Sequence, residues 1–110
     1  MSEKILIVDD EDDIRMLIQG LLEDEGYTVL TAAKADQAYE IIGKHAPQLV
    51  VQDIWLQGSE DDGVDILKNV KETHPEIAFI MISGHGTIET AVSSIQSGAY
   101  DFIEKPFKSD

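Results

Sequence analysis

Two hydrophobic periods alternate along the chain, and this alternation restricts the fold more than any other feature of the sequence. Short runs rich in apolar and β-branched residues, which are typical of strands, occupy residues 4–9, 27–31, 49–53, 77–82 and 99–104. Between these runs, apolar residues recur at the three- and four-residue spacing of a helix face, most clearly over residues 14–22. Such an order predicts a parallel sheet with helices on both faces, because each strand returns through a crossover helix.

Capping residues indicate where the helices begin and end. We expect Asp12 or Asp13 to cap the first helix and Gly26 to end it. Asp62 is expected to cap the third helix, and Thr87 the fourth. The fourth helix would turn four apolar residues toward the sheet, namely Ile88, Ala91, Val92 and Ile95.

Composition excludes several classes of function. The chain has 110 residues, which suits one domain, since two halves would each be too small to bury a core. Without cysteine it has no disulfide, thiolate nucleophile or zinc–thiolate site. No apolar run is long enough to span a membrane. The net charge of −14 argues against direct binding to nucleic acid or to an anionic membrane, and we expect a cytoplasmic domain.

Polar residues follow four of the five predicted strands. Asp9 and Asp10 end the first strand, Asp53 ends the third, Ser83 ends the fourth, and Lys105 follows the fifth. In an open parallel sheet, ligands bind outside the carboxyl ends of the strands. If the first and third strands are neighbours, as in the flavodoxin-like order 2-1-3-4-5, the three carboxylates converge on one crevice.

Three converging carboxylates repel one another, so a bound cation would stabilise them. Mg²⁺ suits the position, because it prefers oxygen ligands and binds through one or two carboxylates, waters and phosphate oxygens. Lys105 would neutralise part of the charge, and Ser83 offers a donor to an oxyanion. Taken singly, each residue suits a helix cap, a turn or a solvated surface. Their joint placement favours phosphoryl transfer to a carboxylate.

Four segments of the chain resemble those of a known family: ILIVDDEDDIR at 5–15, LVVQDIWL at 49–56, IMISGHG at 80–86 and GAYDFIEKPF at 98–107. Through them the whole chain resembles the CheY-like receiver domains of two-component response regulators, and among these the NtrC and NtrX class. The resemblance implies a receiver domain over residues 1–110, forming the N-terminal part of a longer regulator. It also implies a flavodoxin-like, doubly wound, five-stranded parallel sheet.

The resemblance implies a phosphate site and a metal site that share residues. Asp53 matches the phosphoacceptor, and Lys105 matches the lysine that assists it. Asp10, Asp53 and the backbone carbonyl of Trp55 match the direct ligands of Mg²⁺. Asp9 matches the carboxylate that reaches the metal through water.

A switch is implied beside the phosphate site. Ser83 matches the switch hydroxyl and Phe102 the switch aromatic residue. The three acceptor oxygens of a phosphoryl group would draw Ser83 inward and let Phe102 rotate, which would change the face of the fourth helix and fifth strand. Phe102 stands where tyrosine is commoner, so it can be buried without a hydrogen-bond partner. Trp55 and His85 are expected to modulate the lifetime of the phosphate.

Partners are implied by the same resemblance. A sensor histidine kinase would donate the phosphate, and the domain would form a homodimer. Downstream ATPase and DNA-binding domains in the full-length protein would give a transcriptional output. This domain itself is expected to bind neither nucleic acid nor membrane. Since its chemistry would be limited to its own phosphorylation and dephosphorylation, we do not expect an enzyme.

Two parts of the chain depart from the family pattern. After Asp53, Gln57 replaces a proline, and the loop before Gly63 is longer by two residues. Acidic residues 60–62 in that loop lack the spacing of a calcium-binding loop. The chain stops three residues after Phe107, where a fifth helix would begin, so that helix is expected to be missing or truncated. We therefore expect apolar surface beside the first helix and fifth strand, and either self-association through it or disorder at the C-terminus.

Two other functions remain possible from the residues. An Mg²⁺-dependent phosphatase would use Asp10 as an aspartyl nucleophile, because residues 10–12 mimic the Asp-x-Asp pattern. A flavodoxin-like binder of flavin mononucleotide would need a phosphate loop rich in Ser, Thr and Gly, whereas residues 9–13 would repel phosphate. Identifying the aspartate that a small phosphodonor labels would separate the first from the receiver. The absence of a yellow chromophore would dismiss the second.

Overall fold

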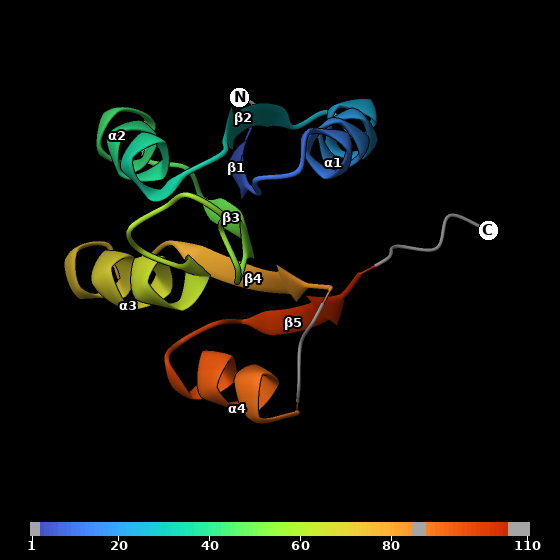
Figure 1. Cartoon of the computed structure of the whole chain (residues 1–110). Coiled ribbons are helices and arrows are strands. Elements are labelled where there is room, and N and C mark those ends of the chain that lie inside the picture. The colour runs from blue at the N-terminus through green and yellow to red at the C-terminus, as the bar shows by residue number, and fades with distance from the viewer. Residues whose placement is uncertain (1–2, 85–87, 106–110) are drawn as a thin grey trace.

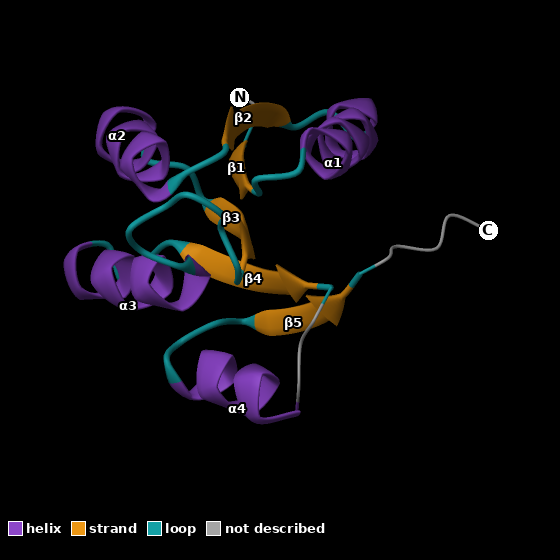
Figure 2. Ribbon diagram, in the orientation of Figure 1, coloured by secondary structure: helices purple, strands orange, loops and turns teal. Residues whose placement is uncertain are grey.

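The computed structural model describes residues 3–84 and 88–105, which form one sheet flanked by helices (Figure 1, Figure 2). The strands are β1 (Lys4–Val8), β2 (Thr28–Ala32), β3 (Leu49–Asp53), β4 (Ala78–Ser83) and β5 (Asp101–Glu104). The helices are α1 (Asp12–Asp24), α2 (Ala35–His45), α3 (Gly63–Thr73) and α4 (Ile88–Gln96). The alternation of strands and helices expected from the sequence is confirmed, with strand ends displaced by at most two residues.

All neighbouring strands are parallel, in the order β2-β1-β3-β4-β5. The predicted flavodoxin-like sheet is therefore confirmed. Helices α2, α3 and α4 cover one face of the sheet, and α1 lies on the other (Figure 1). Strand β2 lies on one side of β1, and β3, β4 and β5 follow on the other side. The carboxyl ends of β1 and β3 therefore lie side by side at the point where the strand order reverses.

The core consists of two clusters, one on each face of the sheet. Strand β1 supplies both, because its side chains alternate: Leu6 and Val8 join the larger cluster under α2 and α3, whereas Ile5 and Ile7 join the smaller one under α1. All four side chains are buried. Burying an aliphatic side chain of this size contributes about 1.5–3 kcal/mol, so β1 anchors the sheet on both faces.

The predicted helix ends were confirmed in two cases and wrong in one. Gly26, with φ of +95°, follows the last turn of α1 and adopts the left-handed conformation that glycine tolerates. Asp62 caps α3 and forms a reciprocal capping box with Asp65. However, the N-cap of α1 is Glu11, whose side chain makes no capping hydrogen bond. The expected caps, Asp12 and Asp13, lie in the first turn, where carboxylates still interact favourably with the helix dipole.

Helix α4 presents a different face to the sheet from the one expected. Ser94 is fully buried, whereas Ile88 is 84% exposed and Val92 and Ile95 are about half exposed. These apolar residues form one stripe along the helix, but the helix is turned so that the buried Ser94, which lies beside Ala91 around the helix, faces the sheet. Spacing alone predicts a stripe and not how the helix is rotated against the sheet. The expected cap, Thr87, lies outside the described residues.

Apolar side chains are exposed on α1 and β5. Leu17 and Leu21 of α1 and Ile103 of β5 each keep two fifths or more of their surface accessible. This agrees with the apolar surface expected beside the first helix and the fifth strand. Residues 106–110, where the fifth helix was expected to be missing or truncated and disorder of the C-terminus was one expected alternative, lie outside the described residues, so these expectations stay predictions. In the part of the chain that the structure describes, no helix is long and apolar enough to cross a membrane.

Candidate functional site

The predicted site residues gather at one edge of the sheet because the carboxyl ends of the strands share that edge. Asp9 and Asp10 directly follow β1, and Asp53 is the last residue of β3. Ser83 is the last residue of β4, and Lys105 directly follows β5. The backbone amide of Lys105 donates to the carbonyl of Ser83 at 2.9 Å, which ties β5 to β4 beside the site.

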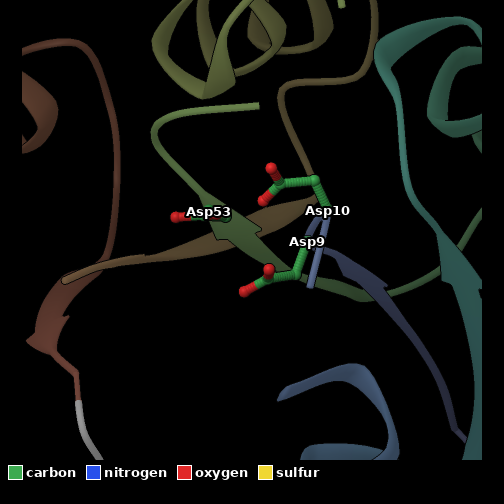
Figure 3. A group of neighbouring side chains, drawn as sticks. All are labelled: Asp9, Asp10 and Asp53. Atoms are coloured by element: carbon green, nitrogen blue, oxygen red, sulfur yellow. The ribbon is translucent and has the colours of Figure 1, made fainter. Parts of the chain in front are cut away.

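The carboxyl groups of Asp9, Asp10 and Asp53 extend to the same side of the strands (Figure 3). One oxygen from each lies within 4.8 Å of the others, a spacing at which all three could hold a metal ion. Asp9 and Asp53 are buried, and Asp10 is half-buried. Three hard oxygen donors in partly buried surroundings suit Mg²⁺, so the residues present fit the expected metal.

Hydrogen bonds fix the two adjacent aspartates. One carboxylate oxygen of Asp9 accepts from the backbone amide of Glu11 at 2.8 Å, and Arg15 donates to the Asp9 carbonyl at 2.7 Å. The Asp10 carboxylate accepts from the backbone amide of Gln57 at 3.1 Å. The loop that follows Asp53 therefore orients the carboxylate that follows β1.

Lys105 brings a buried ammonium group to the carboxylates of the site. Its Nζ lies 2.8 Å from Oδ2 of Asp9 and 3.4 Å from Oδ2 of Asp53, and its side chain is 8% exposed. A third ion pair, to Glu11 at 3.2 Å, reaches toward solvent. Burial lowers the pKa of Lys105, but the neighbouring carboxylates of Asp9 and Asp53 outweigh it and raise the pKa above its ordinary value. Lys105 therefore stays charged at neutral pH.

The carboxyl group of Asp53 is strongly perturbed by its surroundings. Burial raises the pKa of Asp53 from 3.8 to about 7, and the negative charge of Asp9 acts in the same direction. The charge of Lys105 lowers the pKa and offsets part of this effect. Because the raised pKa makes the Asp53 carboxyl hard to ionise in the metal-free protein, a further cation beside it would stabilise its charged form. This again favours a metal at this position.

A cavity of about 260 Å³ opens beside Asp53. It is lined by Asp10, Glu11, Asp53, Trp55, Gln57, Gly84 and Lys105. Trp55 is 51% exposed, so its indole borders the cavity without closing it. The structure therefore brings Trp55 to the site, as expected. Its predicted carbonyl contact with a metal stays a prediction.

Neither of the two expected switch residues lines this cavity. Ser83 is fully buried at the end of β4. Phe102 is half-buried and packs against the larger core cluster, on the side of the sheet that α4 covers. Their movement on phosphorylation stays a prediction. His85, the other expected modulator, lies outside the described residues.

Several residues that contact the site were not assigned a role from the sequence. Glu11 pairs with Lys105, and Gln57 binds Asp10 through its backbone. Gln52 is fully buried, and its side-chain amide donates to the Asp53 carbonyl at 3.0 Å. A glutamine inside an otherwise apolar strand was the available signal for Gln52, whereas a backbone contact such as that of Gln57 leaves no signal in residue type.

Comparison with known proteins agrees with this geometry. A profile of the response regulator receiver domain matches residues 5–110. The nitrogen assimilation regulatory protein NtrX of Azorhizobium caulinodans is 57% identical over 110 residues, covering 100% of this chain and 24% of that protein. The crystal structure of NtrX from Brucella abortus superposes with a TM-score of 0.93 at 59% identity, covering 100% of this chain and 25% of that one.

A solution structure shows a further relative, the beryllofluoride-activated receiver domain dimer of NtrC4. It has a TM-score of 0.88 at 39% identity and covers 96% of this chain and 85% of that one. The chain described here thus spans about a quarter of the length of the two NtrX proteins and most of the length of a separate receiver domain.

Proposed function

This chain belongs to the response regulator receiver domain family, and on that premise we propose that it accepts a phosphoryl group on Asp53 from a sensor histidine kinase. The observation that carries the proposal is the setting of Asp53. It is a buried carboxylate at a strand end, beside two further aspartates, with the Lys105 ammonium 3.4 Å away. A nucleophile, a cation and hard oxygen ligands are thus together at the mouth of a cavity.

The chemistry follows from these groups. A carboxylate oxygen of Asp53 forms a bond to phosphorus while the phosphorus–nitrogen bond of the donor phosphohistidine breaks, and the imidazole nitrogen keeps the electron pair. Lys105 stays within reach of the transferred oxygens, because it already pairs with Asp53 and Asp9. When bound by Asp10, Asp53 and the Trp55 carbonyl, with Asp9 acting through water, Mg²⁺ would neutralise charge on those oxygens.

Phosphorylation would then act on the switch residues. Three new acceptor oxygens at Asp53 would attract the hydroxyl of Ser83, and Phe102 would move further into the core beneath α4. The surface of α4 and β5 would change as a result. The phosphate shifts the balance of two packings only as far as it contacts one of them better.

In the longer regulator, this surface would control downstream ATPase and DNA-binding domains and so a transcriptional output. We propose a homodimer as the working assembly, since apolar side chains are exposed on α1 and β5. The NtrC4 receiver domain is a dimer when activated by beryllofluoride. The domain would catalyse only its own phosphorylation and dephosphorylation.

The only tryptophan of the chain provides the test, since Trp55 borders the cavity. Its fluorescence should change saturably with Mg²⁺ and again when beryllofluoride, a phosphoryl mimic, is added. In Asp53→Asn the beryllofluoride response should be lost. A wild-type protein whose fluorescence responds to neither addition would contradict the proposal.

A second measurement identifies the phosphoacceptor. After treatment with acetyl phosphate, mass spectrometry should find the added phosphoryl group on Asp53 and none in Asp53→Asn. Retention of the label by Asp53→Asn, with the group on Asp10, would instead support a phosphatase with an aspartyl nucleophile.

A further inference from the structure

The loop between β3 and α3 is attached to the site at both of its ends. Near its start, the backbone amide of Gln57 donates to the Asp10 carboxylate at 3.1 Å. At its end, Gly63 lies so close to β3 that an added Cβ atom would be 2.0 Å from the Asp53 carbonyl oxygen. Movement near the start of the loop would therefore act on the Asp10 carboxylate, and movement at its end would act on the backbone of Asp53.

The middle of the loop is attached to α2 instead. The hydroxyl of Ser59 accepts a hydrogen bond from the backbone amide of Ala35, the first residue of α2, at 3.0 Å. The same hydroxyl donates to the backbone carbonyl of Asp61 at 2.9 Å. Ser59 thus joins the loop backbone to the start of α2 and satisfies one of the otherwise unpaired amides there.

A second attachment joins the loop to α2 and α3 together. The Tyr39 hydroxyl donates to the Asp61 carboxylate at 2.7 Å, and the Asn69 side-chain amide donates to the Tyr39 oxygen at 2.9 Å. Burial raises the pKa of Tyr39 to about 12, with the charge of Asp61 acting in the same direction and Asn69 opposing. Tyr39 therefore remains a donor at neutral pH.

We propose that Tyr39 is a positioning residue for the metal site. Its hydroxyl holds Asp61, and through residues 57–62 this contact keeps the Gln57 amide on the Asp10 carboxylate. A carboxylate fixed in one orientation loses less freedom when it binds a cation, so the contact raises metal affinity without touching the metal. The proposal rests on the proposed function, because it assumes that Asp10 binds Mg²⁺.

Tyr39→Phe is the decisive change, because it removes one oxygen and keeps the ring. We expect the dissociation constant for Mg²⁺, followed by Trp55 fluorescence, to rise by about two- to tenfold, which is the range that one lost hydrogen bond supports. Tyr27→Phe makes the same chemical change at a partly exposed tyrosine outside the loop and should leave the constant unchanged.

Two further measurements separate positioning from a general loss of stability. Hydrogen exchange of the Gln57 backbone amide should become faster in Tyr39→Phe, while exchange in β1 stays as in the wild type. Asp61→Ala breaks the same contact from the other side. The double variant should then bind Mg²⁺ no more weakly than the weaker of the two single variants, because both changes remove the Tyr39–Asp61 hydrogen bond and only Asp61→Ala also removes the longer contact with Asn69.

The possible results have distinct meanings. If the wild type shows no response to Mg²⁺, the proposed function fails and not only the role of Tyr39. If the wild type responds and Tyr39→Phe binds Mg²⁺ equally well, with unchanged exchange at Gln57, the role of Tyr39 is overturned. Should Tyr39→Phe fail to fold, Asp61→Asn, which retains an acceptor but weakens the bond, decides by the same two measurements.

Discussion

At the scale of single residues, the carboxyl group of Asp53 is the one expected to bind a proton, a metal ion or a phosphoryl group. Its pKa of about 7 in the folded protein exceeds the value of 3.8 expected without the fold, chiefly because it is buried. The folded state therefore binds this proton more tightly than the unfolded state. That difference stabilises the folded state fully below about pH 4, and the stabilisation is lost as pH rises through about 7.

The first prediction concerns the metal-free protein. In the presence of a chelator, the wild type should lose free energy of unfolding relative to Asp53→Asn as pH rises from about 4 to about 7. Urea denaturation at several pH values measures the difference, with the variant serving as control for all other groups. Parallel pH profiles for the two proteins would show that the carboxyl of Asp53 is not perturbed.

The second prediction concerns Trp55, whose indole borders the cavity beside Asp53. Trp55→Ala should shorten the half-life of the phosphorylated protein by about two- to tenfold, because water reaches the phosphoryl group more easily and each factor of ten needs only about 1.4 kcal/mol of barrier. The half-life is measured by following the loss of the phosphoryl label from the protein with time. Trp55→Phe keeps an aromatic ring and should have a smaller effect, whereas an unchanged half-life in Trp55→Ala would dispose of shielding.

At the scale of elements, Gly63 determines how closely α3 begins beside β3. An alanine there would place Cβ 2.0 Å from the Asp53 carbonyl oxygen. We predict that Gly63→Ala lowers the free energy of unfolding by about 1–3 kcal/mol, the usual cost of overpacking, and weakens Mg²⁺ binding. Gly20→Ala is the matched control. It adds the same methyl group within α1, where no atom outside its own stretch of helix lies within 4 Å, and should raise stability by about 0.5–1 kcal/mol.

Urea denaturation of both alanine variants checks this prediction. Equal effects at the two positions would mean that the backbone of α3 yields freely, and the loop before it could then not position Asp10. Such a result would weaken the role assigned to Tyr39 as well.

The helices and strands could be predicted from the sequence, but the buried face of one helix could not. The two hydrophobic periods predicted β1 to β5 and α1 to α4, and adjacent strand ends brought Asp9, Asp10 and Asp53 together. The buried side of α4 was missed, because burial depends on which residue approaches β5 and Ser94 has no apolar signature. The contact of Tyr39 with Asp61 was also missed, since a side-chain bond between distant segments leaves no period in the sequence.

At the scale of the whole molecule, the charge of −14 opposes the folded state through self-repulsion. We predict that NaCl raises the free energy of unfolding by screening and that MgCl₂ raises it further at matched ionic strength, because only Mg²⁺ also binds the site. The excess due to Mg²⁺ should largely disappear in Asp53→Asn. Equal stabilisation by the two salts would contradict a specific metal site.

Exposed apolar residues predict self-association of the whole molecule. Leu17 and Leu21 of α1 and Ile103 of β5 form the surface expected to be involved. Sedimentation velocity should show a dimer that dissociates with falling concentration, and Leu21→Lys should weaken it. Ile95→Lys adds the same charge on α4 and is the matched control. A monomer at all concentrations would rule out this association.

The order in which the site residues occur along the chain has a consequence for synthesis on the ribosome. Asp9 and Asp10 emerge first, Asp53 follows, and Lys105 emerges after β5. Until then the nascent chain carries the three acids without the ammonium that balances two of them in the finished fold. The charges of the site are therefore balanced only when the last strand is added. In a chain interrupted before β5, the aspartates at the ends of β1 and β3 would repel one another, and this repulsion would oppose the pairing of these strands.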